Sequence, residues 1–318
     1  MKPRIAIASG DPAGIGPEIA LKAALDPAVL AICRPVLVGD KGVFGMHAKG
    51  CGLSLGKIDF LEVKQQKPKI GQIAAAHGTA ALHAAEAAIR AALAGEFAAV
   101  VAAPHTEAAI HAAGIDFDGY PSFVARVAGL PPEDGILMLC FEHQGREVRI
   151  AHVTLHASVA RALKLISKTR VLKTVLAANE ALKKIGIKKP KLVVSGVNPH
   201  AGEGGAFGRE EIEIVDPALQ EARRAGIVVD GPVGADTLIQ RVGYDAYVVM
   251  LHDQGHVAAK LLAPQRVAGL TIGTPVLFSS VAHGSALDIA GKGRANHAAM
   301  VEAITRLATR RNTAAKIK

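Results

Sequence analysis

Short apolar runs recur along the chain, and each predicts a buried strand. They occupy residues 4–9, 35–39, 98–103, 136–141, 148–154, 191–197 and 246–251. The segments between them favour helices at residues 17–25, 73–93, 122–128, 158–182 and 210–224. Turns or loops are expected at residues 64–69, 119–122, 201–205 and 231–236. Strands that alternate with helices predict a mostly parallel α/β architecture, with one hairpin at Gln144-Gly145.

Polar side chains follow three of these runs. The run at 246–251 leads to His252, Asp253 and Gln254, the run at 148–154 to His156, and the run at 191–197 to His200. In α/β sheets, ligands bind just beyond the carboxyl ends of the strands. Three imidazoles without a nearby cysteine are typical of a catalytic divalent-metal site. A single histidine of this kind is more often structural, so the hypothesis requires that all three meet in space.

Two glycine-rich stretches are candidates for ligand contact. Residues 10–18 read G-D-P-A-G-I-G-P-E, which permits close backbone approach but is not the G-x-G-x-x-G fingerprint. Residues 283–296 combine several glycines with Asp288, whose carboxylate can accept hydrogen bonds from ribose hydroxyls. The alternative is a glycine-rich turn that opens the final helix, and composition alone favours that alternative.

Length and charge narrow the class of protein. A chain of 318 residues exceeds the usual single core, so two domains are expected. The three scattered cysteines indicate a reducing compartment, and residues 5–8 are too short for a secretory signal, so a cytoplasmic location is expected. No stretch reads as a membrane span. The net charge of +9 is spread over helix faces and a basic tail that includes Arg310, Arg311, Lys316 and Lys318. Few aromatics accompany it, which argues against a nucleic-acid partner.

Six motifs carry a resemblance to the 4-hydroxythreonine-4-phosphate dehydrogenase family, which covers residues 4–308. They lie at residues 10–18, 153–156, 198–205, 231–236, 252–255 and 283–293. The resemblance implies two α/β/α domains with mostly parallel sheets and a cleft between them, as in isocitrate and isopropylmalate dehydrogenases. It implies a terminal domain of residues 1–130 plus 265–318 that carries the nucleotide loop. A middle domain of residues 131–264 would carry the metal ligands and the contacts of a homodimer, with the active site near the interface.

The resemblance also implies the chemistry. It predicts metal- and NAD-dependent oxidation of a secondary alcohol β to a carboxylate, with decarboxylation. The implied metal ligands are His156, His200 and His252, for zinc or for manganese, magnesium or cobalt, from one subunit or from both. Lys260 or Asp253 is the candidate general base, Lys260 also contacts substrate, and Asp236 orients a ligand histidine. The implied nucleotide-binding residues are His283, Gly284, Ser285, Ala286, Asp288 and Asn296.

Departures from the family pattern concern the substrate. Where the family has G-H-T-E, this chain has residues 119–122, G-Y-P-S, and the family's substrate-contacting asparagine and arginine fall on Gly269 and Phe278. These replacements remove hydrogen-bond donors that could hold a phosphate and add aromatic rings. They therefore favour a flatter, unphosphorylated substrate. The chain therefore looks closest to the terephthalate cis-dihydrodiol dehydrogenases of aromatic catabolism, which yield protocatechuate and carbon dioxide. The expected substrate-binding residues are Tyr120, Pro121, Ser122, Lys260, Gly269 and Phe278.

The sequence is also compatible with other functions. One is the 4-hydroxythreonine-4-phosphate dehydrogenase of pyridoxine biosynthesis, or a dehydrogenase of another small diol acid. A metal-dependent hydrolase could use the same histidines without a dinucleotide. A two-lobed small-molecule binding protein would need neither, but such proteins are usually exported.

Overall fold

The computed structural model describes residues 2–264 and 266–308, and this part of the chain forms two compact units. One unit combines the residues up to Gly135 with those from Thr274 onward, and the other runs from Ile136 to Gly273. These bounds fall five and nine residues after the expected boundaries at 130/131 and 264/265. The basic tail residues from Arg310 to Lys318 lie outside the described residues.

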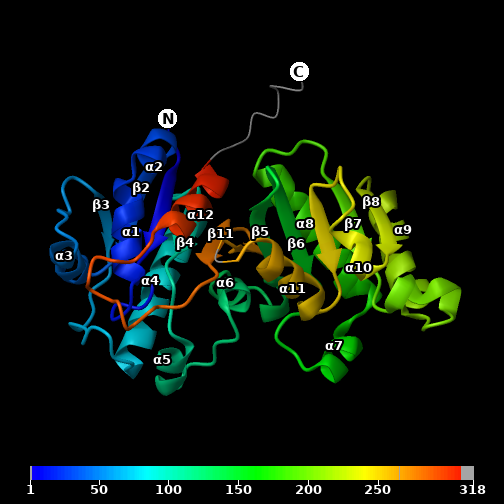
Figure 1. The fold of residues 1–318 in the computed structure, drawn as a ribbon, viewed down its shortest axis with the longest axis horizontal. Coiled ribbons are helices and arrows are strands. Elements are labelled where there is room, and N and C mark those ends of the chain that lie inside the picture. The colour runs from blue at the N-terminus through cyan, green and yellow to red at the C-terminus, as the bar shows by residue number, and fades with distance from the viewer. Residues whose placement is uncertain (1, 265, 309–318) are drawn as a thin grey trace. The chain divides into compact units, whose positions relative to one another are not determined.

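The first unit contains a parallel sheet in the strand order β3-β2-β1-β4-β11 (Figure 1). Its strands are β1 (Arg4–Ala8), β2 (Arg34–Gly39), β3 (Asp59–Glu62), β4 (Ala99–Ala102) and β11 (Phe278–Val281). β1, β2 and β4 are buried along almost their whole length. Continuous apolar runs of this kind are expected when helices cover both faces of a parallel sheet.

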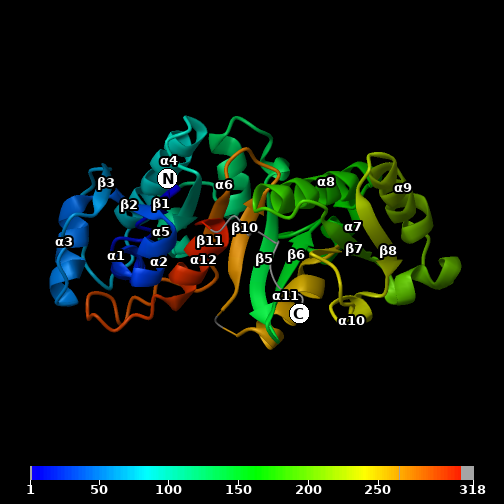
Figure 2. The ribbon, with the colours of Figure 1, turned by 90° about the horizontal axis from the view of Figure 1, so that it is seen from above.

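The helices of the first unit are α1 (Gly16–Leu25), α2 (Pro27–Ile32), α3 (Lys41–Gly50), α4 (Ala75–Leu93), α5 (Glu107–Ala112), α6 (Tyr120–Val127), the 3-10 turn η1 (Pro132–Asp134) and α12 (Ala298–Ala308). α4 and α6 pack on one face of the sheet in a core that includes Ala6, Val38 and Val100. α1, α2 and α12 lie together on the opposite face (Figure 2).

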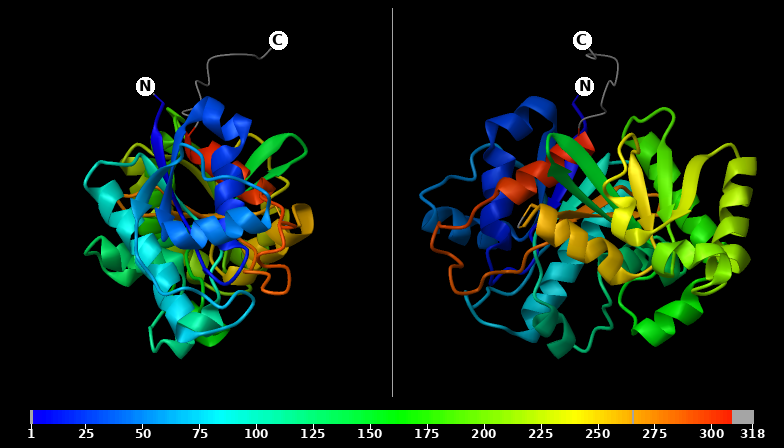
Figure 3. Two further views of the ribbon diagram at one scale, coloured as in Figure 1. Left: turned by 90° about the vertical axis from the view of Figure 1, so that its left-hand side faces the viewer. Right: turned by 45° about the vertical axis from the view of Figure 1, so that its right-hand side comes forward.

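The second unit contains a mixed sheet in the order β10-β5-β6-β9-β7-β8. Its strands are β5 (Ile136–His143), β6 (Arg146–His152), β7 (Lys191–Ser195), β8 (Val228–Val233), β9 (Ala246–Val249) and β10 (Ala268–Ile272). β5 pairs antiparallel with β6 and β10, and the other pairs are parallel. The helical segments are α7 (Val159–Leu165), α8 (Lys168–Lys184), η2 (Pro199–Gly205), η3 (Glu211–Val215), α9 (Asp216–Arg224), α10 (Ala235–Leu238) and α11 (His252–Leu262). α11 packs along β5 and β6 (Figure 3).

The structure confirms the mostly parallel α/β class and the hairpin at residues 136–154. Several expected elements were wrong in detail. Residues 158–182 form two helices, because Ser167 starts α8 by accepting a hydrogen bond from Arg170 N. Tyr120 begins a helix and is not part of a turn, and residues 231–233 belong to β8. None of the described helices combines the length and apolarity needed to cross a bilayer.

Candidate functional site

The N-terminal motif, residues 10–18, holds the glycine-rich C-terminal loop, residues 283–296. Asp11 is fully buried; its Oδ1 accepts a hydrogen bond from Ala13 N at 2.8 Å, and its other oxygen bonds the Thr106 hydroxyl. Thr106 Oγ1 also hydrogen-bonds Ser285 Oγ at 2.9 Å. Ile15 N donates to Ser285 O at 2.8 Å. These bonds hold the first part of the C-terminal loop against the N-terminal motif.

Glycine is required in the N-terminal motif by this contact. A Cβ on Gly14 would lie 2.6 Å from the Cβ of Ser285 and 2.7 Å from its carbonyl oxygen. Both distances are shorter than van der Waals contact permits, so any side chain there would push the loop away. The glycine thus serves packing between two chain segments.

The far end of the C-terminal loop is held by an ion pair between the buried Glu18 and the partly buried Lys22. Glu18 Oε1 accepts from Lys22 Nζ at 2.7 Å and from Ala295 N at 2.8 Å. Lys22 Nζ also donates to the carbonyls of Gly293 and Ala295, at 3.0 and 2.9 Å. Backbone groups thus share Lys22 Nζ and Glu18 Oε1, whereas Glu18 Oε2 is buried with no hydrogen-bond partner among the described residues. Sequence reasoning gave no role to Asp11, Glu18 or Lys22.

Between these two anchors the loop exposes part of its surface. Gly284, Asp288 and Asn296 are exposed, and His283 and Ala286 are half-buried. Ser285, in contrast, is buried by its contacts with the N-terminal motif. Asn296 also caps α12, since its Oδ1 accepts from Ala298 N at 2.9 Å. An exposed carboxylate on a backbone-lined loop suits a ribose, so this part of the loop fits a dinucleotide.

Aromatic rings gather around Tyr120 in the same unit. The Tyr120 ring centroid lies 4.8 Å from Phe278, 4.8 Å from His105 and 5.6 Å from Phe117. We call these four residues the aromatic cluster. Tyr120 is 4 % exposed and Phe278 fully buried, and burial lowers the pKa of His105, which favours its neutral form. The Tyr120 hydroxyl is buried, with no hydrogen-bond partner among the described residues.

The residues expected to bind substrate have the following surroundings, and their role in binding stays a prediction. The Phe278 ring is fully buried and packs against the Tyr120 ring within this unit. Ser122 Oγ bonds the carboxylate of Asp118 and the carbonyl of Gly119. Pro121 is buried beside it in the first turn of α6. Gly269 is buried in β10 of the other unit, opposite Leu139.

In the second unit, the H-D-Q-G motif, residues 252–255, begins α11. His252 Nδ1 lies 2.7 Å from Asp253 Oδ1, which leaves its Nε2 directed away from that contact. A carboxylate on the remote ring nitrogen is the usual way to orient a metal-ligating histidine. This contact suits Asp253 to orient His252, and the orienting role expected of Asp236 stays a prediction. Asp236 lies on α10 and lines a pocket of about 800 Å³ with Asp253, and no described histidine is hydrogen-bonded to it.

The other two residues of the motif are structural. Gln254 Oε1 accepts from Met250 N and Leu251 N at 2.9 and 3.0 Å, and its Nε2 donates to Gly196 O at 3.1 Å. It thereby connects the ends of two neighbouring strands, β9 and β7. A Cβ on Gly255 would lie 2.3 Å from His152 Nε2. Glycine at this position therefore lets α11 approach β6.

Four histidines of the second unit lie in a row. His156 and His252 have ring centroids 6.0 Å apart, His252 stacks on His256 at 3.8 Å, and His256 lies 4.8 Å from His152. Burial and neighbouring imidazoles lower the pKa of His256 to about 4 and that of His152 to about 3. His152 and His256 were not predicted, although His256 follows His252 by one helical turn. His252, His256 and Lys260 follow one another at every fourth residue along α11, with Lys260 exposed.

The expected metal ligands fit a metal only in part. Two imidazoles on one ion place their ring centroids roughly 5–6 Å apart, so His156 and His252 suit a shared metal. His200 lies in the η2 loop, where its ring faces Phe207 at 6.1 Å. Across the described ranges, no three His, Cys, Asp or Glu side chains form a group that could hold a metal ion. One chain thus brings two of the three histidines together.

The η2 loop is itself well ordered by a buried glutamate. Glu211 Oε1 accepts from Val197 N and Asn198 N, at 2.7 and 2.8 Å. The residues from His200 to Gly204 have positive φ angles. The strained segment is therefore anchored at its start, and His200 is exposed on it. Sequence reasoning missed Glu211, which stands eleven residues beyond the motif's histidine.

Comparison with known proteins identifies the relatives of the chain. Residues 31–307 match the family model described as "Pyridoxal phosphate biosynthetic protein PdxA". A Comamonas 1,2-dihydroxy-3,5-cyclohexadiene-1,4-dicarboxylate dehydrogenase is 43 % identical over 96 % of both chains. The crystal structure of a terephthalate 1,2-cis-dihydrodiol dehydrogenase from Burkholderia xenovorans is 43 % identical, with a TM-score of 0.75 over 96 % of this chain and 97 % of the other.

Two further solved structures share the fold of this chain. A 4-hydroxythreonine-4-phosphate dehydrogenase from Burkholderia phymatum is 33 % identical, with a TM-score of 0.83 over 97 % of this chain and 98 % of the other. A β-decarboxylating dehydrogenase from Thermococcus kodakarensis, 17 % identical, shares the fold with a TM-score of 0.51 over 96 % of this chain and 81 % of the other. The expected likeness to the fold of β-decarboxylating dehydrogenases is confirmed. The chain belongs to the PdxA family and is an oxidoreductase, a dehydrogenase of that family.

Proposed function

We propose that this dehydrogenase oxidises a cyclic cis-diol carboxylate, 1,2-dihydroxy-3,5-cyclohexadiene-1,4-dicarboxylate, with NAD and a divalent metal. Loss of carbon dioxide then yields protocatechuate. The observation that carries the substrate assignment is the aromatic cluster. Its half-buried members, His105 and Phe117, offer ring surface, and they pack on Tyr120, a ring that stands where the family has a polar donor. The 43 % identity to the Comamonas dihydrodiol dehydrogenase supports it.

A phosphorylated substrate would find few partners beside the aromatic cluster. Pro121 has no side-chain donor, Phe278 has no polar atom, and the Ser122 hydroxyl already bonds Asp118 and Gly119. A phosphate dianion without charge-assisted donors would lose its hydration at a cost of several kcal/mol. A cyclohexadiene ring suits an apolar aromatic surface, and the buried Tyr120 hydroxyl could donate to one carboxylate or hydroxyl.

NAD would bind to the exposed part of the C-terminal loop. Gly284 and Ala286 would offer close backbone approach, and the Asp288 carboxylate would accept from the ribose hydroxyls of NAD. The same carboxylate would repel a 2′-phosphate. The bonds from Asp11, Thr106 and Glu18 hold the loop in place before the nucleotide binds.

The divalent metal would be bound by His156, His200 and His252 in a homodimer. Because one chain does not bring His200 to the other two histidines, we infer that His200 and His252 reach one metal from different copies. A bound divalent metal would act as a Lewis acid toward the substrate hydroxyl and carboxylate. Zinc suits imidazole ligands, and manganese, magnesium and cobalt are the alternatives to be compared.

Two residues of α11, Asp253 and Lys260, have the remaining roles in the proposed reaction. Asp253 holds His252 through Nδ1, and its carboxylate is therefore engaged. Lys260 stands two turns further along the same face of α11, so we assign the acceptance of the hydroxyl proton to its amine in the neutral form. Asp236 lacks a histidine partner among the described residues and takes no part in this assignment.

The test is NADH formation with three substrates, each assayed with and without added zinc or manganese. They are the cis-dihydrodiol dicarboxylate, D-threonate 4-phosphate and 4-hydroxythreonine 4-phosphate. We expect kcat/KM for the dihydrodiol to exceed that for either phosphorylated substrate by at least about a hundredfold. Efficient turnover of 4-hydroxythreonine 4-phosphate with no reaction of the dihydrodiol would overturn the proposal in favour of 4-hydroxythreonine-4-phosphate dehydrogenase, the activity named for the Burkholderia phymatum structure.

A further inference from the structure

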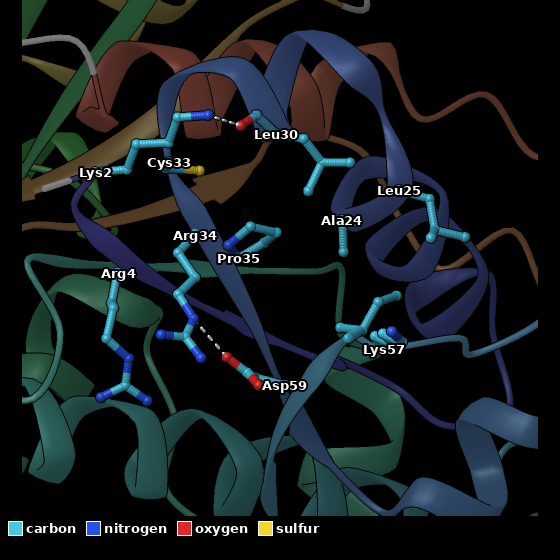
Figure 4. Close-up of a pocket in the computed structure, with 11 residues that line it drawn as sticks. Lys2, Arg4, Ala24, Leu25, Leu30, Cys33, Arg34, Pro35, Lys57 and Asp59 are labelled. Carbon is cyan, nitrogen blue, oxygen red and sulfur yellow. Dashed lines mark hydrogen bonds and ion pairs between the residues drawn. The ribbon is translucent and has the colours of Figure 1, made fainter.

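A second pocket lies at the edge of the first unit's sheet where the strands begin. Its volume is about 640 Å³, and it lies between the first residues of β1, β2 and β3 and the ends of α1 and α2 (Figure 4). The C-terminal loop is bound at the opposite edge of this parallel sheet, since Asp11 and Thr106 follow the ends of β1 and β4. The nucleotide site proposed above therefore does not use this pocket.

The rim of the pocket is positively charged. Four basic residues line it, namely Lys2, Arg4, Arg34 and Lys57, against the single carboxylate of Asp59. Asp59 Oδ2 accepts from Arg34 Nε at 2.7 Å, so this bond engages one of the three guanidinium nitrogens (Figure 4). Lys57 has no hydrogen-bond or ion-pair partner among the described residues. Cationic donors therefore exceed the available anions on this rim.

Part of this charge is held in place. Lys2 Nζ donates to Leu30 O at 2.6 Å, and the guanidinium of Arg4 lies over the Phe97 ring at 4.9 Å. Arg4 and Arg34 are directly opposite each other in the register of β1 and β2. Two arginines on adjacent strands offer planar donors, which suit a carboxylate.

The floor of the pocket is apolar. Leu25, Leu30 and Pro35 line it, and the Leu30 side chain is 44 % exposed. Cys33 lies among them (Figure 4). Burial raises the pKa of the Cys33 thiol to about 11, so the thiol is neutral near pH 7 and adds to the apolar surface.

We propose that this pocket binds a small organic anion, a carboxylate carried on an apolar body. The cationic rim would hold the carboxylate and the floor would bury the hydrocarbon. A bare inorganic anion would leave the floor uncovered, and a neutral apolar molecule would leave the rim unpaired. The volume of the pocket lies within the range for small-molecule sites.

Octanoate is the probe, because an aliphatic acid does not resemble the ring substrate proposed for the active site. Binding to the full chain is measured by isothermal titration calorimetry, with inorganic phosphate as a parallel titrant. The charge variant is Arg34→Met and the floor variant is Leu30→Ser. The matched control is Arg90→Met, since Arg90 pairs with Glu86 and its side chain is 63 % exposed, against 65 % for Arg34.

We expect octanoate to bind with one site per chain and at least about tenfold more tightly than phosphate. Arg34→Met and Leu30→Ser should each weaken octanoate about tenfold, while Arg90→Met should leave its affinity unchanged. Equal affinity in Arg34→Met and the parent protein would overturn the proposal, as would phosphate binding as tightly as octanoate. Neither result depends on turnover, so the proposed dehydrogenase function can fail or succeed separately.

Discussion

The N-terminal motif and the H-D-Q-G motif both consist of small and polar residues, but they stabilise different kinds of structure. In the first unit, Asp11 and Glu18 are buried and bond to groups of the same unit, so the loop they hold is complete in one chain. In the second unit, Gln254 and Gly255 are equally well packed, but they support a histidine whose expected partner His200 is not gathered with it among the described residues. The N-terminal motif therefore holds a loop that is complete in one chain, whereas the H-D-Q-G motif positions only one of the expected metal ligands.

This difference follows from the kind of ligand each region is suited to bind. A dinucleotide can be held largely by backbone groups, which a folded loop supplies by itself. A metal needs several side-chain donors at about 2 Å, and these can come from separate chains. Substitutions should therefore affect the two regions independently.

The largest expected effect comes from His252→Ala. Removing this imidazole should lower kcat/KM by at least about a thousandfold, because the site would lose one of three metal ligands. Bound metal, measured by plasma mass spectrometry, should fall in parallel, while circular dichroism stays native. Full metal occupancy in this variant, and in His156→Ala and His200→Ala, would refute the ligand assignment.

Asp288→Asn should change cofactor choice without affecting metal content. Loss of the charge that repels a 2′-phosphate should reduce the preference for NAD over NADP, from roughly a hundredfold to a few-fold. The measurement is kcat/KM for each nucleotide in the parent and the variant. A parent protein that uses both nucleotides equally well would contradict the role given to Asp288.

Glycine substitutions separate the two regions most clearly. Gly14→Ala should raise the KM for NAD, because its Cβ would displace Ser285, and should leave metal binding unchanged. Gly255→Ala should weaken metal binding, because its Cβ would meet His152 Nε2, and should leave NAD binding unchanged. Each should reduce the free energy of unfolding by about 1–3 kcal/mol.

Gly45→Ala is the control for both glycine variants. Gly45 lies in α3, and a Cβ added there would meet nothing within 4 Å, so alanine should be neutral or slightly stabilising. The same loss of stability in Gly45→Ala would show that the contacts at Gly14 and Gly255 are not the cause. Chemical denaturation supplies the comparison.

The smallest effect is expected from Tyr120→Phe. The Tyr120 hydroxyl has no described partner, so its removal should leave stability unchanged or increase it slightly. If the hydroxyl donates to the substrate, the KM for the dihydrodiol should rise several-fold with little change for NAD. An unchanged KM would remove Tyr120 from the substrate contacts. Phe278→Arg is a poorer test, because a buried charge there would disrupt the core.

The sequence predicted most of the fold because apolar runs such as residues 98–103 and 246–251 report burial directly. It could not show that Ser167 divides one helical pattern into two, since a serine in such a pattern is also compatible with a continuous helix. For the site, the pattern located His156 and His252 after their strands. It missed Glu211, Thr106 and His256, whose roles depend on contacts with distant or differently oriented segments.

The inference that His200 and His252 serve one metal from different copies is tested most directly by combining two inactive variants. His200→Ala and His252→Ala are co-expressed with different tags, and turnover of the dihydrodiol is measured on the isolated mixed dimers and on each variant alone. In a mixed dimer one site loses both histidines and the other keeps both, so about half of the parent protein's activity per dimer is expected. Activity of the mixed dimers no higher than that of either variant alone would contradict the inference.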